Sequence, residues 1–381
     1  MTARYTRRQF LGRCACGGLG AALGAAIPCP AFAQDRRAAR WAAAGDLREA
    51  AFWEPAGDGR TRCLTCPNEC VCAEGGVTAC RTRINLGGRL YSMTYGRPCV
   101  VFQDALEKNP LYHVTPGQEA LGIGTAGCNL RCLYCQNWEF SQYGPWETRN
   151  MSLAPDALVE RAVSRGLKWI TFSYTEPVAY LEYALDVARL AKQRGLRCAV
   201  VTGGFIHPKP LAALLECGAA FSVTLKGADE QFYRDVVACP RDSVWQTIRS
   251  IAQSGRWIEV VNLIVPTMND QPEGIRAIAR SLAGLNPDIP LHFLRFAPAY
   301  KLKHLPPTPR ETLEQARDIA MKEGLRFVYL ANLPGHEGAS TVCPACRRTL
   351  IERVGFKVLR NDIRGGRCPA CQAKVPGVDL G

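Results

Sequence analysis

The sequence predicts an α/β fold, and three features carry this prediction. Short apolar runs alternate with stretches of helical periodicity from about residue 118 to about residue 330. Prolines stand near the starts of the predicted helices, where a missing N–H costs little, and glycines stand just past most of their ends. Because repeated strand–helix units place parallel strands side by side, we expect an α/β barrel or an open sheet.

The apolar runs predict the strands, and the amphipathic stretches between them predict the helices. We expect strands at 120–124, 169–174, 197–202, 220–225, 257–264, 291–295 and 326–330. We expect helices near 155–165, 178–194, 208–217, 242–254, 272–284 and 309–323. In such folds the functional face lies at the carboxyl ends of the strands. Polar residues that follow predicted strands, such as Glu176, Thr202 and Lys226, are therefore candidates for a site.

The first 33 residues predict an export signal. Arg7 and Arg8 precede a stretch rich in glycine and alanine that runs to about Ile27, and Ala31-Phe32-Ala33 follows. This order is typical of a twin-arginine signal peptide and predicts a periplasmic protein. The alternative is an accidental basic start, which would leave the protein in the cytoplasm. The apolar stretch is too short and too rich in glycine for a membrane span, and we expect no integral span elsewhere.

Composition and charge describe an ordinary globular protein. The chain has 381 residues, of which 47% are hydrophobic and 21% are charged. Its formal net charge is +13, but the basic residues are spread along the chain, so we do not expect nucleic acid as a partner. We divide the chain into a signal peptide (1–33), a linker with a cysteine-rich segment (34–117), the α/β unit (118–335) and a small C-terminal domain (336–381).

Three cysteines follow the first predicted strand. Cys128, Cys132 and Cys135 have three and then two intervening residues, which suits an iron–sulfur cluster with three protein ligands and one iron open to an external ligand. Tyr134 stands just before the third cysteine, where its ring could flank an adenine. The alternatives are a zinc site that lacks its fourth ligand, or an oxidised pair with a spare thiol. Zinc loops usually use two separated pairs, and no fourth Cys or His stands nearby in sequence.

The C-terminal cysteines form two further pairs. Cys343 and Cys346 make one pair, Cys368 and Cys371 make the other, and each pair encloses two residues. This spacing predicts a zinc ribbon with four thiolate ligands. Disulfide bonds are the alternative, particularly in an exported protein.

A third group lies before the α/β unit and consists of Cys63, Cys66, Cys70 and Cys80, with Cys72 as an extra thiol. These residues provide enough ligands for zinc or for an auxiliary iron–sulfur cluster. Sequence cannot choose between them, but the spacing of Cys63 and Cys66, and an expected position remote from the α/β unit, slightly favour zinc.

Together these motifs resemble the radical S-adenosylmethionine (radical SAM) enzymes of the AmmeMemoRadiSam system, which are relatives of pyruvate formate-lyase activating enzymes. The resemblance runs from about residue 60 to the C-terminus. Besides the early cysteines, it rests on Tyr95-Gly96-Arg97-Pro98, Gly127 to Trp138, Thr175-Glu176-Pro177, Val201 to Ile206, Leu225-Lys226-Gly227, Val261 to Pro266 and Asn332 to Gly338.

The resemblance implies a partial barrel of six to seven strand–helix units, of the (β/α)6 type. It implies that Cys128, Cys132 and Cys135 hold a [4Fe–4S] cluster that reductively cleaves S-adenosylmethionine to a 5′-deoxyadenosyl radical. That radical would abstract hydrogen from an unknown substrate, a partner protein being one candidate, and an electron donor would be a further partner. The expected contacts to S-adenosylmethionine are Tyr134 beside the adenine, Thr175 and Glu176 at the amino group, and Thr202, Gly203 and Lys226.

Two positions depart from the pattern of this family. Relatives commonly have Asp where this chain has Thr224, and they often have Asn-Gly where it has Gly203-Gly204. The missing carboxylate and the export signal leave a second hypothesis open. In that hypothesis the chain is a non-catalytic exported protein that binds iron–sulfur clusters and zinc, or that transfers electrons.

Overall fold

The computed structural model describes residues 36–43, 45 and 47–381 of the chain. The predicted signal peptide at 1–33 lies outside these residues. Among the helices that the structure describes, none has the length and apolar character needed to cross a membrane.

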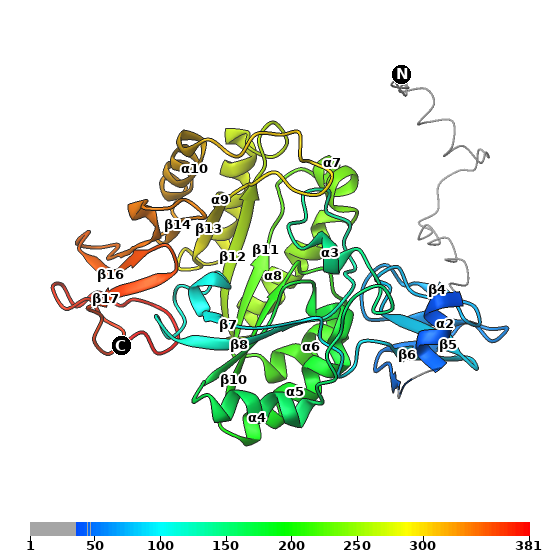
Figure 1. The fold of residues 1–381 in the computed structure, drawn as a ribbon. Helices are drawn as coiled ribbons and strands as arrows, with labels where there is room; N and C mark the ends of the chain where they lie inside the picture. The colour runs from blue at the N-terminus through cyan, green and yellow to red at the C-terminus, as the bar shows by residue number, and fades with distance from the viewer. Residues whose placement is uncertain (1–35, 44, 46) are drawn as a thin grey trace, which may run out of the picture.

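An eight-stranded sheet forms the centre of the protein (Figure 1). Strands β8 to β14 are parallel and follow one another in chain order, and β7 pairs with β8 in the antiparallel sense. The sheet does not close, because its edge strands β14 and β7 are not paired with each other in the described structure. Its strands are β7 (Val100–Ala105), β8 (Glu119–Gly124), β9 (Trp169–Phe172), β10 (Arg197–Thr202), β11 (Ala220–Thr224), β12 (Trp257–Ile264), β13 (Leu291–Arg295) and β14 (Val328–Ala331).

Six amphipathic helices connect these strands and bury their apolar sides against the sheet. They are α4 (Pro155–Ser164), α5 (Leu181–Gln193), α6 (Pro208–Cys217), α8 (Arg241–Gln253), α9 (Pro272–Leu285) and α10 (Arg310–Lys322). The shorter elements are α3 (Trp138–Ser141), α7 (Glu230–Phe232), the π-helix η3 (Tyr233–Val237) and the 3-10 helices η1 (Leu106–Lys108), η2 (Pro177–Tyr180) and η4 (Glu337–Ala339).

All seven expected strands and all six expected helices are present, with ends within about three residues of their predicted positions. The predicted strand at 169–174 stops at Phe172, because the chain turns at Tyr174, where φ is +68°. Strand β7 was not predicted. It is an antiparallel edge strand that lies before the alternating pattern begins, so it carries no strand–helix signal of its own.

The N-terminal segment forms two small antiparallel sheets beside the central sheet (Figure 1). One contains β1 (Arg48–Glu49), β6 (Arg89–Ser92) and β5 (Arg83–Leu86), and the other contains β2 (Trp53–Pro55), β3 (Thr61–Cys63) and β4 (Val71–Cys72). Helix α2 (Arg36–Ala43) packs on this segment. The buried guanidinium of Arg83 contacts both carboxylate oxygens of Glu182 on α5, at 3.1 and 3.0 Å. This ion pair fastens the N-terminal segment to the central domain.

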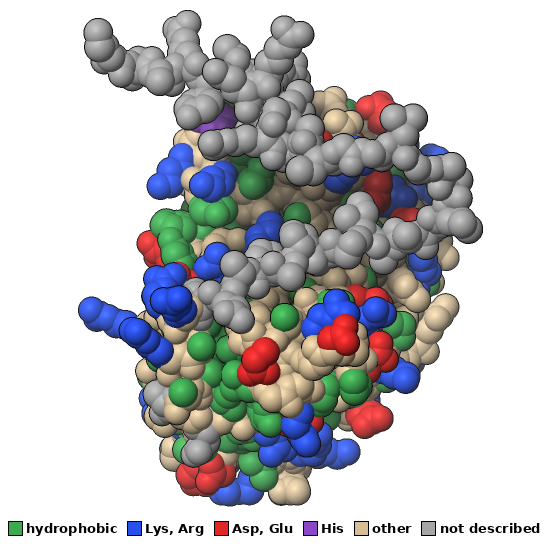
Figure 2. All heavy atoms as spheres, turned by 90° about the vertical axis from the view of Figure 1, so that its right-hand side faces the viewer, with side chains coloured by type: hydrophobic (Ala, Val, Ile, Leu, Met, Phe, Trp, Pro, Cys, Tyr) green, Lys and Arg blue, Asp and Glu red, His purple; other side chains and the backbone are tan. Residues whose placement is uncertain are grey.

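Figure 2 shows the face of the molecule that carries the N-terminal segment. Basic, acidic and apolar side chains are mixed on it, and no patch of one charge is visible where side chains are drawn in colour.

The C-terminal domain is a three-stranded antiparallel sheet of β15 (Thr341–Val342), β16 (Thr349–Val354) and β17 (Lys357–Asn361). Buried polar contacts join it to the central domain. Arg353 on β16 donates to the carbonyl oxygen of Tyr112 at 2.7 Å. The ring of His113, between β7 and β8, shares a hydrogen bond of 2.7 Å with the carbonyl oxygen of Pro376 in the C-terminal domain.

Candidate functional site

A cavity of about 410 Å³ opens at the carboxyl ends of the parallel strands. Volumes of this order are typical of small-molecule sites. All nine residues that the sequence predicted for the cluster and for S-adenosylmethionine line this one cavity. They are Cys128, Cys132, Tyr134, Cys135, Thr175, Glu176, Thr202, Gly203 and Lys226.

The loop with the three cysteines follows β8 and is held by backbone hydrogen bonds. Arg131 donates its N–H to Val237 at 2.9 Å, and Leu133 donates to Val236 at 3.0 Å, so the π-helix η3 supports the loop. The thiol of Cys128 accepts from the N–H of Leu130 at 3.4 Å. These contacts fix the direction in which the cysteine side chains enter the cavity.

Glu176 is the buried carboxylate of the cavity. It follows β9 and accepts from the hydroxyl of Thr202 at 2.6 Å and from the N–H of Gly203 at 2.7 Å. Burial raises its pKa, although these hydrogen bonds and the nearby Lys226 act in the opposite direction. A Cβ at Gly203 would lie 2.5 Å from Leu130 Cδ1 and 3.2 Å from Glu176 Oε2, so glycine suits the close approach of the carboxylate at this position. The carboxylate is therefore held in one orientation before any ligand binds.

Two further side chains shape the cavity near the cysteines. The ring of Tyr134 stacks on Phe232 at the end of α7, with a centroid distance of 6.2 Å. Burial raises the pKa of Cys132, and the charge of Lys226, which follows β11, acts in the opposite direction. Thr175 donates its hydroxyl to the carbonyl oxygen of Thr125 at 2.8 Å and its backbone N–H to the carbonyl oxygen of Ser173 at 2.9 Å, so both of its donors are used.

The cavity also contains residues that the sequence did not predict. Phe102 comes from β7, Lys108 from η1 and Phe356 from the hairpin between β16 and β17. Trp138 and Tyr300 stack at 5.5 Å close to the cysteine loop. Trp138 ends the cysteine motif, so the sequence could have indicated it as a site residue. Phe356 reaches the cavity through tertiary packing, for which the sequence has no local signal.

The four C-terminal cysteines converge as predicted. The ligand atoms of Cys343, Cys346, Cys368 and Cys371 all lie within 4.8 Å of one another. Cys343 and Cys371 are 3.6 Å apart at sulfur, and Cys346 and Cys368 are 3.7 Å apart. Four sulfurs at about these distances can surround one ion at the Zn–S bond length of about 2.3 Å.

The early cysteines are also brought together, and they are not remote from the cavity. Cys63, Cys66, Cys70 and Cys80 are all buried. Cys66 packs in the same hydrophobic cluster as Cys128 and Cys132. The expectation that this group lies far from the α/β unit is therefore wrong. Its separation in sequence is bridged because the N-terminal segment folds back onto the cysteine loop.

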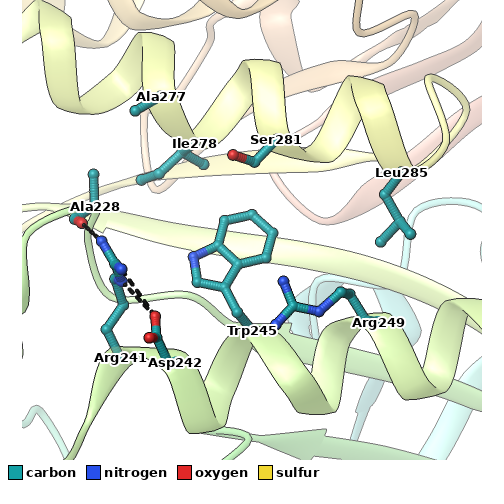
Figure 3. Close-up of a pocket in the computed structure, with 9 residues that line it drawn as sticks. All are labelled: Ala228, Arg241, Asp242, Trp245, Arg249, Ala277, Ile278, Ser281 and Leu285. Atoms are coloured by element: carbon teal, nitrogen blue, oxygen red, sulfur yellow. Dashed lines mark hydrogen bonds and ion pairs between the residues drawn. The ribbon is translucent and has the colours of Figure 1, made fainter.

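A second hollow lies on the outer surface between α8 and α9 (Figure 3). Trp245 projects from α8 into it, and Arg241 donates to the carbonyl oxygen of Ala228 at 2.7 Å and contacts Asp242 at 2.8 Å. None of the cysteines or predicted cofactor contacts lines this hollow, so we assign no cofactor to it.

Comparison with known proteins identifies the central domain. Residues 123–280 match the Radical SAM superfamily. This chain belongs to the radical SAM superfamily. It is 40% identical over 332 residues to an uncharacterized protein of Methanocaldococcus jannaschii, and the match covers 86% of this chain and 99% of that one.

More distant relatives of this radical SAM protein include activating enzymes. It is 23% identical over 169 residues to the pyruvate formate-lyase-activating enzyme of Clostridium pasteurianum, covering 42% of this chain and 67% of that enzyme. Among solved structures, a domain of pyruvate-formate lyase-activating enzyme from Bacteroides vulgatus aligns with a TM-score of 0.37 and 17% identity, covering 42% of this chain and 98% of that one.

Membership of the superfamily implies a [4Fe–4S] cluster and S-adenosylmethionine, and the residues of the cavity fit both. Three thiols in one cavity suit a cluster that keeps one iron open. Burial raises the pKa of Cys128, so this thiol stays protonated at neutral pH until a metal displaces its proton. The carboxylate of Glu176 and the ammonium of Lys226 provide opposite charges for a ligand that carries both an amino and a carboxyl group.

Proposed function

We propose that this radical SAM protein cleaves S-adenosylmethionine reductively at a [4Fe–4S] cluster held by Cys128, Cys132 and Cys135. When bound and reduced by an external donor, this cluster would supply one electron to the sulfonium of S-adenosylmethionine, which would give methionine and a 5′-deoxyadenosyl radical able to take hydrogen from a substrate C–H bond. The observation that carries this proposal is the meeting of the three thiols with Glu176 in one cavity.

The remaining residues of the cavity would bind and orient S-adenosylmethionine. Glu176 would accept from its ammonium group, with Thr202 and Gly203 holding the carboxylate in place. Tyr134 would lie beside the adenine, and Lys226 would pair with the carboxylate of the methionine moiety. Thr175 would contribute to the same turn as Glu176. Because Glu176 is already oriented, little freedom is lost when the ligand binds.

We further propose that the substrate is a partner protein, as it is for the activating enzymes that the chain resembles, and that the chain belongs to the AmmeMemoRadiSam system. The matches to activating enzymes support the first part. The sequence motifs support the second. The aromatic pair of Trp138 and Tyr300 near the cysteine loop would give a protein segment an apolar surface to contact.

Binding of S-adenosylmethionine to the open iron can be tested by electron paramagnetic resonance. We expect the spectrum of the reduced, anaerobically reconstituted protein to change when S-adenosylmethionine is added. Cys343→Ser, which alters a cysteine outside the cavity, should retain this change, and Cys128→Ala should lose it. A reduced cluster that depends on Cys128 but does not respond to S-adenosylmethionine would contradict the proposal.

That contradicting result would favour the second candidate, an exported electron-transfer or metal-binding protein without catalysis. One observation favours this candidate. Thr224 lines the cavity where relatives commonly place a carboxylate, so one charge near the cofactor is missing.

We propose that Cys343, Cys346, Cys368 and Cys371 bind zinc, as their compact arrangement supports. We also propose export by the twin-arginine route, on the basis of the first 33 residues. Cell fractionation tests this second point. We expect the protein in the periplasm, and we expect a variant carrying Arg7→Lys and Arg8→Lys to stay in the cytoplasm. Equal distribution of both proteins would contradict export by this route.

A further inference from the structure

The four early cysteines form a second buried thiol cluster. Cys63 lies at the end of β3, Cys66 and Cys70 lie in the loop before β4, and Cys80 precedes β5. Cys63 donates its N–H to the carbonyl oxygen of Cys70 at 3.0 Å, and the thiol of Cys70 accepts from the N–H of Ala79 at 3.3 Å. All four cysteines are less than 8% exposed. Buried thiols that converge from three segments are typical of a metal centre.

The spacing of these thiols differs from that of the C-terminal cysteines. Four thiolates around one zinc ion lie about 3.8 Å from one another, because each Zn–S bond is about 2.3 Å long and the geometry is tetrahedral. The C-terminal set meets this condition. In the described part of the chain, no other set of three or more Cys, His, Asp or Glu side chains is as compact.

A cubane cluster needs the wider spacing, because it binds each cysteine through a different iron. The cysteine loop of the central domain, which the superfamily uses for a [4Fe–4S] cluster, is likewise absent from the compact sets. Like the cysteine loop, the early cysteines form no set as compact as the proposed zinc site in the described part of the chain.

Hydrogen-bond donors surround the early thiols. The sulfur of Cys80 lies 3.1 Å from the hydroxyl of Thr78 and 3.0 Å from that of Thr82. The guanidinium of Arg83 lies 4.0 Å from the same sulfur. Donors aimed at the sulfurs stabilise added negative charge, which is how proteins adjust the reduction potential of an iron–sulfur cluster.

The early cysteines are connected directly to the cysteine loop of the cavity. Asn68, between Cys66 and Cys70, donates its side-chain N–H to the carbonyl oxygen of Asn129 at 3.1 Å. Asn129 is the residue after Cys128. One hydrogen bond thus completes a short path between the two sets of thiols.

We infer that Cys63, Cys66, Cys70 and Cys80 hold a second [4Fe–4S] cluster that exchanges electrons with the cluster in the cavity. The electron exchange rests on the proposed function, because that proposal places the other cluster in the cavity. A low-potential one-electron donor such as dithionite supplies the electron. Transfer between the clusters oxidises one by a single electron and reduces the other by the same amount, with no bond formed or broken.

Metal and sulfide analysis of the full-length, anaerobically reconstituted protein tests the site. We expect about eight irons and eight sulfides per chain, from two cubane clusters. A variant with Ala at Cys128, Cys132 and Cys135 should keep about four irons, and it should keep them when Cys368→Ser and Cys371→Ser are added. Cys66→Ser combined with Cys70→Ser should also leave about four irons, whereas Cys198→Ala, a buried control in β10, should leave about eight.

The opposite result is equally clear. About four irons and two zinc ions in the unaltered protein, with Cys66→Ser and Cys70→Ser removing zinc but no iron, would overturn the inference. The two proposals fail separately. Eight irons without a response to S-adenosylmethionine would leave the second cluster standing, and a response with four irons would leave the proposed function standing.

Electron paramagnetic resonance of the fully reduced protein tests the proximity of the clusters. Two nearby paramagnetic clusters broaden each other's signals. We therefore expect the spectrum of the unaltered protein to differ from the sum of the spectra of the two cluster-deficient variants. A spectrum equal to that sum would contradict electron exchange between neighbouring clusters.

Discussion

The side chain of Asn68 donates a hydrogen bond of 3.1 Å to the backbone carbonyl of Asn129. The two residues are 61 positions apart in sequence. This bond joins the loop of the early cysteines to the loop that lines the cavity. The N-terminal segment is thus part of the surroundings of the proposed cofactor site. A change in the conformation of one loop should therefore alter the conformation of the other.

Gly127 should be intolerant of a side chain. Its φ is +85°, and a Cβ would lie 2.3 Å from both the carbonyl oxygen of Cys80 and Thr82 Cγ2. We expect Gly127→Ala to lower the iron content and to destabilise the protein by more than about 1 kcal/mol. Gly195→Ala is the control, because Gly195 has a φ of +71° but open space around it. Iron analysis and urea denaturation of both variants check this, and equal effects would contradict it.

The buried ion pair between Arg83 and Glu182 should be essential for stability. Both side chains are at most 3% exposed. We expect Glu182→Gln to lower the free energy of unfolding by about 3–5 kcal/mol, because it leaves a buried guanidinium without its counter-charge. The exposed pair of Arg194 and Glu160 provides the control, where Glu160→Gln should cost about 1 kcal/mol or less. Denaturant titrations that give similar losses for both variants would count against this assignment.

Glu176 should control affinity for S-adenosylmethionine. We expect Glu176→Gln to weaken binding about 10- to 100-fold, because a hydrogen bond to a charged group contributes about 1.5–3 kcal/mol. Equilibrium dialysis with the reconstituted protein measures this. Glu119→Gln, an exposed change at the opposite end of β8, should bind normally. Unchanged affinity in Glu176→Gln would rule out the proposed contact with the ammonium group.

His113 should make the protein sensitive to acid. Burial lowers its pKa from 6.5 to about 4, so the unfolded chain takes up the proton first as the pH falls. Stability present above pH 6.5 is therefore lost between pH 6.5 and 4, by about 3 kcal/mol. We expect His113→Gln to flatten this part of the stability–pH profile, and His304→Gln, at an exposed position, to leave it unchanged. A profile with the same slope after His113→Gln would show that other groups are responsible.

The C-terminal cysteines should bind metal independently of the iron. We expect Cys368→Ser to remove about one zinc ion per chain while the iron content stays constant. Atomic absorption measures both metals, and Cys217→Ser, which lies at the end of α6, serves as the control. Loss of iron instead of zinc would assign these cysteines to a cluster.

Much of the fold could be predicted because its signals are local. Apolar runs, prolines at helix starts and glycines after helix ends mark strands β8 to β14 and the six helices between them. The cysteine loop and Glu176 could be predicted as site residues because each follows a parallel strand, and the carboxyl ends of parallel strands meet at one edge.

The remaining features depend on contacts between distant segments. Strand β7 is defined by its partner β8, and Phe356 reaches the cavity only because the C-terminal sheet packs against the central domain. The early cysteines were expected far from the cavity because their proximity to it likewise depends on packing between segments that are distant in sequence. No local sequence pattern predicts the contact between Asn68 and Asn129, because that contact depends on how the N-terminal segment packs against the central domain.

Formation of 5′-deoxyadenosine tests the proposed function most directly. The anaerobically reconstituted full-length protein would be incubated with S-adenosylmethionine and dithionite, and the product measured by mass spectrometry. We predict 5′-deoxyadenosine from the unaltered protein and from Cys198→Ala, and none from Cys128→Ala. Absence of 5′-deoxyadenosine from unaltered protein with intact clusters, or equal formation by Cys128→Ala, would contradict the proposed function.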